Sequence, residues 1–175
     1  MTAHHPAGGG EALVGELAGA VPGAHGWCEF GQPTLDVPVP SWVAAVRTAR
    51  DRFGFDYFDW LSALDEGDGR VRVVVHLWSR ERRSHLLVRT AVAGDDALPS
   101  LTGVYAGAGW HERETAEMFG VRVTGFDDGS GQGIRPLLLR ADAPPHPLRK
   151  APPASPPARP AGARSRPGPS AGAGS

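Results

Sequence analysis

The sequence predicts an α+β protein, in which helices cover one side of a mostly antiparallel sheet, followed by an extended or disordered C-terminal tail. Two observations support this fold class. Short β-rich runs separated by turn residues alternate with segments whose apolar residues recur at helical spacing. Their order is helix, two short strands, helix, hairpin and helix, which is typical of an antiparallel sheet with helices on one side.

The first half of the chain contains two predicted helices around two short strands. Apolar residues at helical spacing predict a helix over Glu11–Ala20, and short strands follow over Trp27–Phe30 and Thr34–Val37. The next helix is expected to start after Ser41, as its N-cap, and to end at Gly54. Its expected buried stripe is Trp42, Val46 and Ala49.

The second half is expected to hold a β-hairpin and a charged helix. Phe55–Asp65 is an aromatic and aspartate-rich run, either strand or irregular, and Val71–Trp78 and His85–Val92 form the hairpin. Gly94–Pro99 is expected to be a loop, and Trp110–Val121 the charged helix. Two extended pieces, Val121–Thr124 and Ile134–Leu139, are expected around the glycine-rich loop Asp127–Gly133.

The distribution of charge and proline predicts the domain boundaries. Residues 1–10 are a His- and Gly-rich lead expected to be disordered, residues 11–142 form the folded domain, and residues 143–175 form a Pro/Ala/Arg-rich disordered tail. Ten of the 17 prolines and five of the 18 basic residues lie in this tail, whereas all 19 acidic residues precede it. The tail has no aromatic residue to stack on bases, so we do not expect nucleic-acid binding.

Cysteine content and hydropathy restrict the possible classes further. The single cysteine, Cys28, excludes a disulfide framework and a cysteine-ligated iron–sulfur cluster within this sequence. No apolar run reaches the ~18–20 residues that a membrane-spanning helix needs. The apolar start contains Glu11 and Glu16 and lacks a basic lead, unlike a secretion signal. We therefore expect a soluble, intracellular protein.

The segment Trp110–Val121, W-H-E-R-E-T-A-E-M-F-G-V, contains the candidate functional residues. A catalytic interpretation would use Glu112 and Glu114 as an acid/base pair, but two residues on a helix are roughly 200° apart, so these side chains diverge. His111 and Glu114 supply only half of a metal site. We therefore expect no catalytic, cofactor-binding or metal-binding residue here.

An interface interpretation fits the same segment better. Carboxylates and an arginine surrounded by Trp110, Met118 and Phe119 would lose hydration at a cost unless they are paired across a contact. Arg113 and Glu117 are also close enough to pair within the helix, and Gly120 is suited to end it. The alternative is an ordinary half-exposed surface helix whose charges remain in water.

The run from Glu112 to Val121 resembles the signature of the 30-kilodalton subunit of respiratory complex I, also called the C subunit of NADH-quinone oxidoreductase. Its pattern is E-R-E-x-x-(D/E)-hydrophobic-(F/Y)-G-(I/V), and every fixed position matches. The leucine run Pro136–Leu139 and the segment His146–Lys150, H-P-L-R-K, are also similar to the family. The resemblance covers about residues 39–150.

This resemblance implies an α+β subunit without a cofactor of its own. NADH, FMN, iron–sulfur clusters and quinone would be carried by partner subunits, and the chain would dock on the quinone-site subunit, which is the D subunit of the complex. It would lie in the peripheral arm at the cytoplasmic face of the bacterial plasma membrane, associated with the membrane only through the complex. The residues that the resemblance and the interface interpretation assign to docking are Trp110, Glu112, Arg113, Glu114, Glu117, Met118, Phe119, Gly120, His146 and Arg149.

Two alternatives remain open from the sequence. One is the equivalent subunit of a related membrane-bound hydrogenase-type complex, and the other is a stand-alone carboxylate-dependent hydrolase. The chain also departs from the family at Gly125-Phe126-Asp127, where Gly-His-Pro is usual, and after Lys150, where the family continues with an acidic and aromatic segment.

Overall fold

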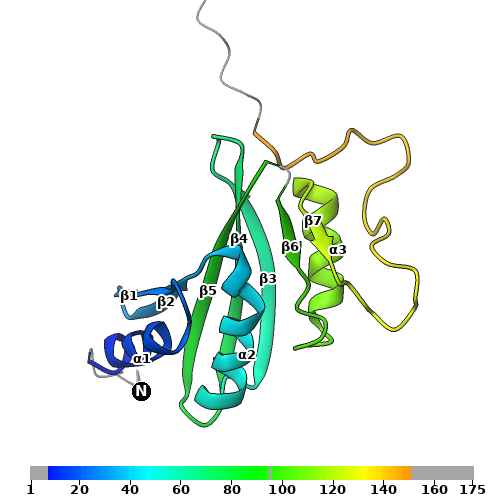
Figure 1. Cartoon of the computed structure of the whole chain (residues 1–175). Helices are drawn as coiled ribbons and strands as arrows, with labels where there is room; N and C mark the ends of the chain where they lie inside the picture. The colour runs from blue at the N-terminus through cyan, green and yellow to red at the C-terminus, as the bar shows by residue number, and fades with distance from the viewer. Residues whose placement is uncertain (1–7, 95, 151–175) are drawn as a thin grey trace, which may run out of the picture.

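The computed structural model describes residues 8–94 and 96–150, which form a main sheet with helices on one side and at one edge, and a second sheet of two short strands (Figure 1). The predicted tail from residue 151 onward lies outside the described residues. The helices and strands are α1 (Gly8–Ala20), β1 (His25–Glu29), β2 (Gln32–Asp36), the short 3₁₀ helix η1 (Val39–Ser41), α2 (Trp42–Phe53), β3 (Tyr57–Asp65), β4 (Arg70–Ser79), β5 (Ser84–Ala93), β6 (Ala97–Pro99), α3 (Ala108–Phe119) and β7 (Arg122–Thr124).

The main sheet has five strands in the order β1-β2-β5-β4-β3. Three of its four neighbouring pairs are antiparallel, and only β2 and β5 run parallel. The predicted hairpin is confirmed as β4 and β5, which pair along their whole length from Arg70 opposite Ala93 to Ser79 opposite Ser84. The predicted α+β class with a mostly antiparallel sheet is therefore confirmed.

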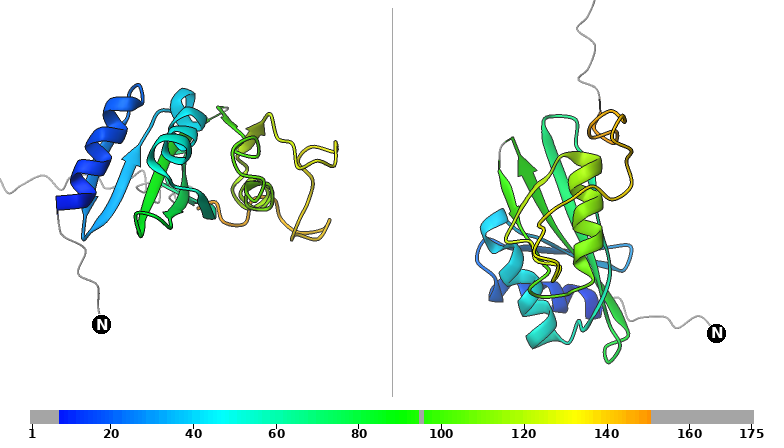
Figure 2. Two further views of the ribbon diagram at one scale, coloured as in Figure 1. Left: turned by 90° about the horizontal axis from the view of Figure 1, so that it is seen from below. Right: turned by 90° about the vertical axis from the view of Figure 1, so that its right-hand side faces the viewer.

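The hydrophobic core lies between the sheet and helices α1 and α2, which cover the same face (Figure 2). Alternate residues of β4 and β5, among them Val73, Val75 and Val88, point to this face and are fully buried. The predicted stripe of α2 is also confirmed, since Trp42, Val46 and Ala49 have no exposed surface. Helix α3 packs instead against β3, the edge strand of the sheet.

The start of α1 and the role of Ser41 differ from the prediction. Helix α1 starts at Gly8, so residues 8–10 of the predicted lead belong to the helix. Ser41 occupies the N-cap position of α2, but its hydroxyl donates a hydrogen bond to the carbonyl of Pro22 and does not cap the helix. The predicted exit at Gly54 is confirmed, with φ of 72° in the left-handed region.

Two predictions in the second half were wrong. The expected loop Gly94–Pro99 contains β6, which pairs in parallel with β7. The expected extended piece Ile134–Leu139 forms no strand and follows an irregular path along α3.

Residues 146–150, which the sequence assigns to the tail, hydrogen bond to the domain through Leu148 and Lys150. In the described part of the chain no helix is long and apolar enough to cross a membrane.

Candidate functional site: the charged helix and its surroundings

The charged segment forms helix α3, as predicted, and ends at Gly120 with φ of 71°. It starts at Ala108, two residues before the predicted Trp110. Glu112 is fully buried, whereas Glu114 is exposed, so the predicted divergence of these two carboxylates is confirmed. The helix therefore separates its charged residues into a side that contacts the rest of the chain and a side that faces solvent.

Glu112 joins α3 to the segment after β6. Its carboxylate accepts hydrogen bonds from the Ser100 hydroxyl at 2.6 Å and from the backbone N–H of Leu101 at 2.5 Å. Burial raises the pKa of Glu112 above its usual value, and the two hydrogen bonds only partly oppose this rise. Ser100 was not among the predicted site residues, because nothing in the local sequence indicates that its hydroxyl meets a residue twelve positions later.

Arg113 joins α3 to the segment that follows the glycine-rich loop. Its guanidinium donates hydrogen bonds to the carbonyl oxygens of Arg135 at 3.2 Å and Pro136 at 2.7 Å. It also lies 5.4 Å from the centre of the Trp110 ring, within the range of a cation–π contact. The charge of Arg113 is thus satisfied by carbonyl dipoles and an aromatic ring of the same chain.

Glu117 binds the same segment a few residues further along the chain. Its carboxylate accepts hydrogen bonds from three successive backbone N–H groups, those of Leu137, Leu138 and Leu139, at 3.2, 2.7 and 3.1 Å. Burial tends to raise the pKa of Glu117, but these bonds and the charge of Arg113 outweigh it, and the pKa lies below its usual value. Arg113 and Glu117, which the sequence places close enough to pair, therefore form no direct ion pair with each other. Both instead hydrogen bond to the backbone of the irregular segment 135–139.

Residues 146–150, which we call the C-terminal strap, cross the end of α3 and reach β3. Within this strap, the His146 ring nitrogen lies 3.1 Å from the carbonyl oxygen of Glu117, and the Leu148 N–H donates to the carbonyl of Met118. Arg149 forms an ion pair of 3.2 Å with the buried carboxylate of Asp65, which also accepts the backbone N–H of Lys150.

Gly120 is the point at which the helix and the strap meet most closely. A Cβ atom added to Gly120 would lie 2.8 Å from Cδ2 of His146, closer than real Cβ atoms approach other atoms. The structure therefore brings together His146 and the Met118–Gly120 end of the charged helix, two predicted site elements more than twenty residues apart. Asp65, the residue that fixes the end of the strap, was not predicted as a site residue.

The solvent-facing side of α3 carries Trp110, Glu114 and Met118, which are four residues apart along the helix; we call them the α3 stripe. Trp110 is 67% exposed, Glu114 is exposed and Met118 is half-buried. Two exposed leucines are attached near the C-terminal end of the helix through their backbone N–H groups: Leu138, 61% exposed, at Glu117, and Leu148, 53% exposed, at Met118. Of the ten predicted docking residues, Trp110 and Glu114 are therefore the exposed side chains on α3, while Glu112, Arg113 and Phe119 are buried in the chain itself.

His111 provides a further contact that the sequence did not predict. Its Nδ1 atom lies 3.1 Å from the carbonyl oxygen and 3.4 Å from the amide nitrogen of Leu61 in β3, and its ring meets Phe58 edge-on at 5.3 Å. The helix thus covers backbone groups that the edge strand would otherwise expose. Among the described residues no group of three or more His, Cys, Asp or Glu side chains is placed to hold a metal ion.

The fold and this site define a class of small α+β protein. In this class a glutamate-rich helix is hydrogen bonded to its own chain on one side and exposes an aromatic and acidic stripe on the other. More specifically, the chain belongs to the family of the 30-kilodalton subunit of respiratory-chain NADH dehydrogenase, whose family model matches residues 35–158. The recognition of this family from the sequence is thereby confirmed.

Individual relatives agree with this assignment. The chain is 35% identical over 144 residues to the C subunit of NADH-quinone oxidoreductase from Phenylobacterium zucineum, covering 80% of this chain and 66% of the relative. It is 35% identical over 145 residues to the protein of the same name from Rhodopseudomonas palustris strain TIE-1, covering 81% and 68%. The chain thus spans about two thirds of the length of these relatives.

A solved structure shares the fold. A chain of the membrane-bound sulfane sulfur reductase, an archaeal respiratory membrane complex, matches with a TM-score of 0.61 at 23% identity. The match covers 70% of this chain and 75% of that chain. It supports the arrangement of sheet and helices described above.

Proposed function

We propose that this chain is a peripheral-arm subunit of a proton-translocating NADH:quinone oxidoreductase and that it docks on the quinone-site subunit through the α3 stripe. It contributes structure to the electron path from NADH to quinone, while flavin, iron–sulfur clusters and quinone are held by partner subunits. Its position is the cytoplasmic face of the bacterial plasma membrane. Membership of the 30-kilodalton family supports the choice of complex.

The exposure of Trp110 and Glu114 is the observation that carries the choice of surface. Three other charged side chains of α3 form their hydrogen bonds within the chain: those of Glu112, Arg113 and Glu117. The carboxylate of Glu114, by contrast, forms no ion pair or hydrogen bond with any described residue. A partner surface that fits this stripe offers an apolar pocket for the indole of Trp110 and a basic side chain for Glu114.

Substitution of the two stripe residues tests this proposal. We expect Trp110→Ala to weaken association with the quinone-site subunit by about 2 kcal/mol, or roughly 30-fold, because exposed tryptophans that become buried at interfaces are frequent hot spots. Glu114→Ala is expected to weaken it as well, while both variants keep the fold of the isolated chain. The measurement is the amount of the quinone-site subunit that co-purifies with the tagged chain from native membranes.

Glu16→Ala is the matched control, since Glu16 is an exposed glutamate on α1, away from the stripe. Co-purification at the wild-type level in both stripe variants would refute docking through α3. Recovery of nickel–iron subunits without an NADH-binding subunit would refute the choice of complex and favour the hydrogenase-type relative.

A further inference from the structure

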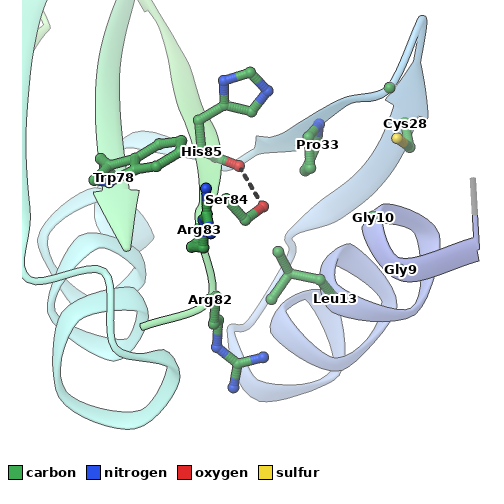
Figure 3. A pocket seen from close by; sticks show the side chains of 11 residues that line it. Gly9, Gly10, Leu13, Cys28, Pro33, Trp78, Arg82, Arg83, Ser84 and His85 are labelled. Carbon is green, nitrogen blue, oxygen red and sulfur yellow. Dashed lines mark hydrogen bonds between the residues drawn. The ribbon is translucent and has the colours of Figure 1, made fainter. Parts of the chain in front are cut away.

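A cavity of about 530 Å³ lies between the start of α1, the β1–β2 hairpin and the β4–β5 turn, where β2 and β5 diverge (Figure 3). The two strands pair only over Thr34–Asp36 and Leu87–Arg89, although β5 begins three residues earlier, at Ser84. Beside the start of β5 the described structure has no pairing β2 residue. The first turn of α1 closes the gap on the helical side, and its residues Gly9 and Gly10 add no side chain to fill it.

The walls of this cavity are mainly apolar. Leu13 of α1 and Pro33 of β2 are buried, and Trp78 of β4 is half-buried against His85, with their ring centres 6.2 Å apart. Cys28 of β1 is also half-buried and is a free thiol. A cavity of this volume with apolar walls is in the range of small-molecule sites, which measure about 300–1,000 Å³.

The mouth of the cavity is positively charged. Arg82 and Arg83 of the β4–β5 turn line it, and none of its lining residues is Asp or Glu. Arg82 is fixed there by a hydrogen bond of 2.6 Å from its Nε to the carbonyl of Phe53. Among the described residues neither arginine forms an ion pair, in contrast with Arg80, which is paired with Asp56.

We propose that this cavity binds a small organic anion with an apolar body, whose carboxylate or phosphate is held by Arg83 and the outer nitrogens of Arg82 while its apolar part lies against Leu13, Pro33 and Trp78. A free medium-chain carboxylate and the head and upper chain of an anionic lipid share this chemistry. The site is independent of the α3 stripe, so it does not rest on the function proposed above.

Cys28 makes the test specific to the site, because it is the only cysteine of the chain and lines the cavity. The full-length chain is treated with N-ethylmaleimide, and the rate of Cys28 alkylation is measured with octanoate, octylamine or acetate. We expect octanoate to slow alkylation in a saturable way below its micellar concentration. Octylamine, with the opposite charge, and acetate, without the apolar body, are expected to leave the rate unchanged.

Two arginine variants test the role of charge. Arg83→Gln is expected to weaken protection by octanoate about tenfold, through loss of a charge-assisted contact. Arg47→Gln is the matched control, because Arg47 is an exposed arginine on α2 that does not line the cavity. Backbone amide spectra of both variants establish that they are folded as the parent is.

Vesicles distinguish the two sources of the ligand. Protection of Cys28 by phosphatidylglycerol vesicles but not by phosphatidylcholine vesicles, together with protection by octanoate, would identify a lipid; protection by octanoate alone would identify a free anion. Absence of protection by octanoate, equal protection by octylamine, or equal effects of Arg83→Gln and Arg47→Gln would overturn the proposal.

Discussion

Glu112 and Glu117 show how two carboxylates on one helix acquire opposite acidities. Glu112 is fully buried and receives two hydrogen bonds, so the loss of hydration dominates and its pKa rises. Glu117 is only half-buried and receives three backbone hydrogen bonds near a guanidinium, so its pKa falls. Both residues match the same family pattern, yet their chemistry is decided by the number of donors and by burial.

The raised pKa of Glu112 predicts a pH-dependent effect of Glu112→Gln. The pKa of Glu112 in the folded state lies above the unfolded value of about 4.5, so the native state binds the proton more tightly than the unfolded state does. Proton binding therefore stabilises the fold fully below pH 4.5. This stabilisation is lost as pH rises through the folded-state pKa. Glutamine does not titrate, and its oxygen and NH₂ group can bond to Leu101 and Ser100. The variant should therefore gain stability relative to the parent as pH rises.

The measurement is the free energy of unfolding in urea for both proteins at pH 4.5 and pH 7.5. We expect the difference, variant minus parent, to be larger at pH 7.5. A difference that is equal at the two pH values would show that Glu112 does not titrate differently in the folded and unfolded states. Comparison of the two proteins at each pH removes the contribution of all other groups.

At the scale of elements, α3 is held in place by three irregular segments and the edge strand. Residues 100–101 bind Glu112, residues 135–139 bind Arg113 and Glu117, and the C-terminal strap binds the end of the helix and Asp65. These contacts set the direction of the α3 stripe, because they leave only one side of the helix exposed. The strap is therefore part of the structure that positions the proposed docking surface.

Gly120→Ala tests the contact between the helix and the strap. Alanine at position 120 would have to keep the left-handed backbone conformation, at a cost of about 1–2 kcal/mol. Its methyl group would also force the His146 ring to shift. Gly54→Ala is a matched control, because Gly54 also ends a helix with positive φ, but the nearest atom to its Cβ would be 3.7 Å away. We expect thermal unfolding to show a greater loss of stability at position 120.

The excess loss at position 120 should shrink when His146→Ala is added, because the clash is then relieved. If Gly120→Ala and Gly54→Ala destabilise equally, or if His146→Ala does not reduce the difference, the strap does not pack against Gly120 as described. The double-mutant comparison separates the contact from the backbone cost, which both glycine variants share.

At the scale of the whole molecule, patterns local in sequence predicted most of the fold. The β4–β5 hairpin and the stripe of α2 were predictable because each follows from periodicity within about ten residues. The parallel pairing of β6 with β7 was not, since each strand has only three residues and the two are separated by α3. The irregular path of residues 134–139 was also missed, because it is set by the side chains of α3 rather than by its own sequence.

The candidate site was predictable to a similar extent. Trp110 and Glu114 were identified and lie on the exposed side, and Gly120 ends the helix as expected. The interface interpretation of the sequence expected the carboxylates and the arginine of the helix to be paired across a contact, with Arg113 and Glu117 also close enough to pair within the helix. For Glu112, Arg113 and Glu117 the partners are mainly main-chain groups of the same chain, with the Ser100 hydroxyl as a second partner of Glu112. Main-chain groups leave no pattern in the residue types. Ser100 and Asp65 were missed because their side chains meet Glu112 and Arg149, which are distant in the sequence.

The most direct test of docking through α3 is site-specific cross-linking in the native membrane. Photoreactive benzoylphenylalanine is placed at position 110, and in a separate sample at position 16, and the cross-linked chains are identified by mass spectrometry after illumination. We expect the quinone-site subunit of NADH:quinone oxidoreductase to be linked from position 110 and not from position 16. Equal linkage from both positions, or linkage from position 110 to a different protein, would contradict this expectation.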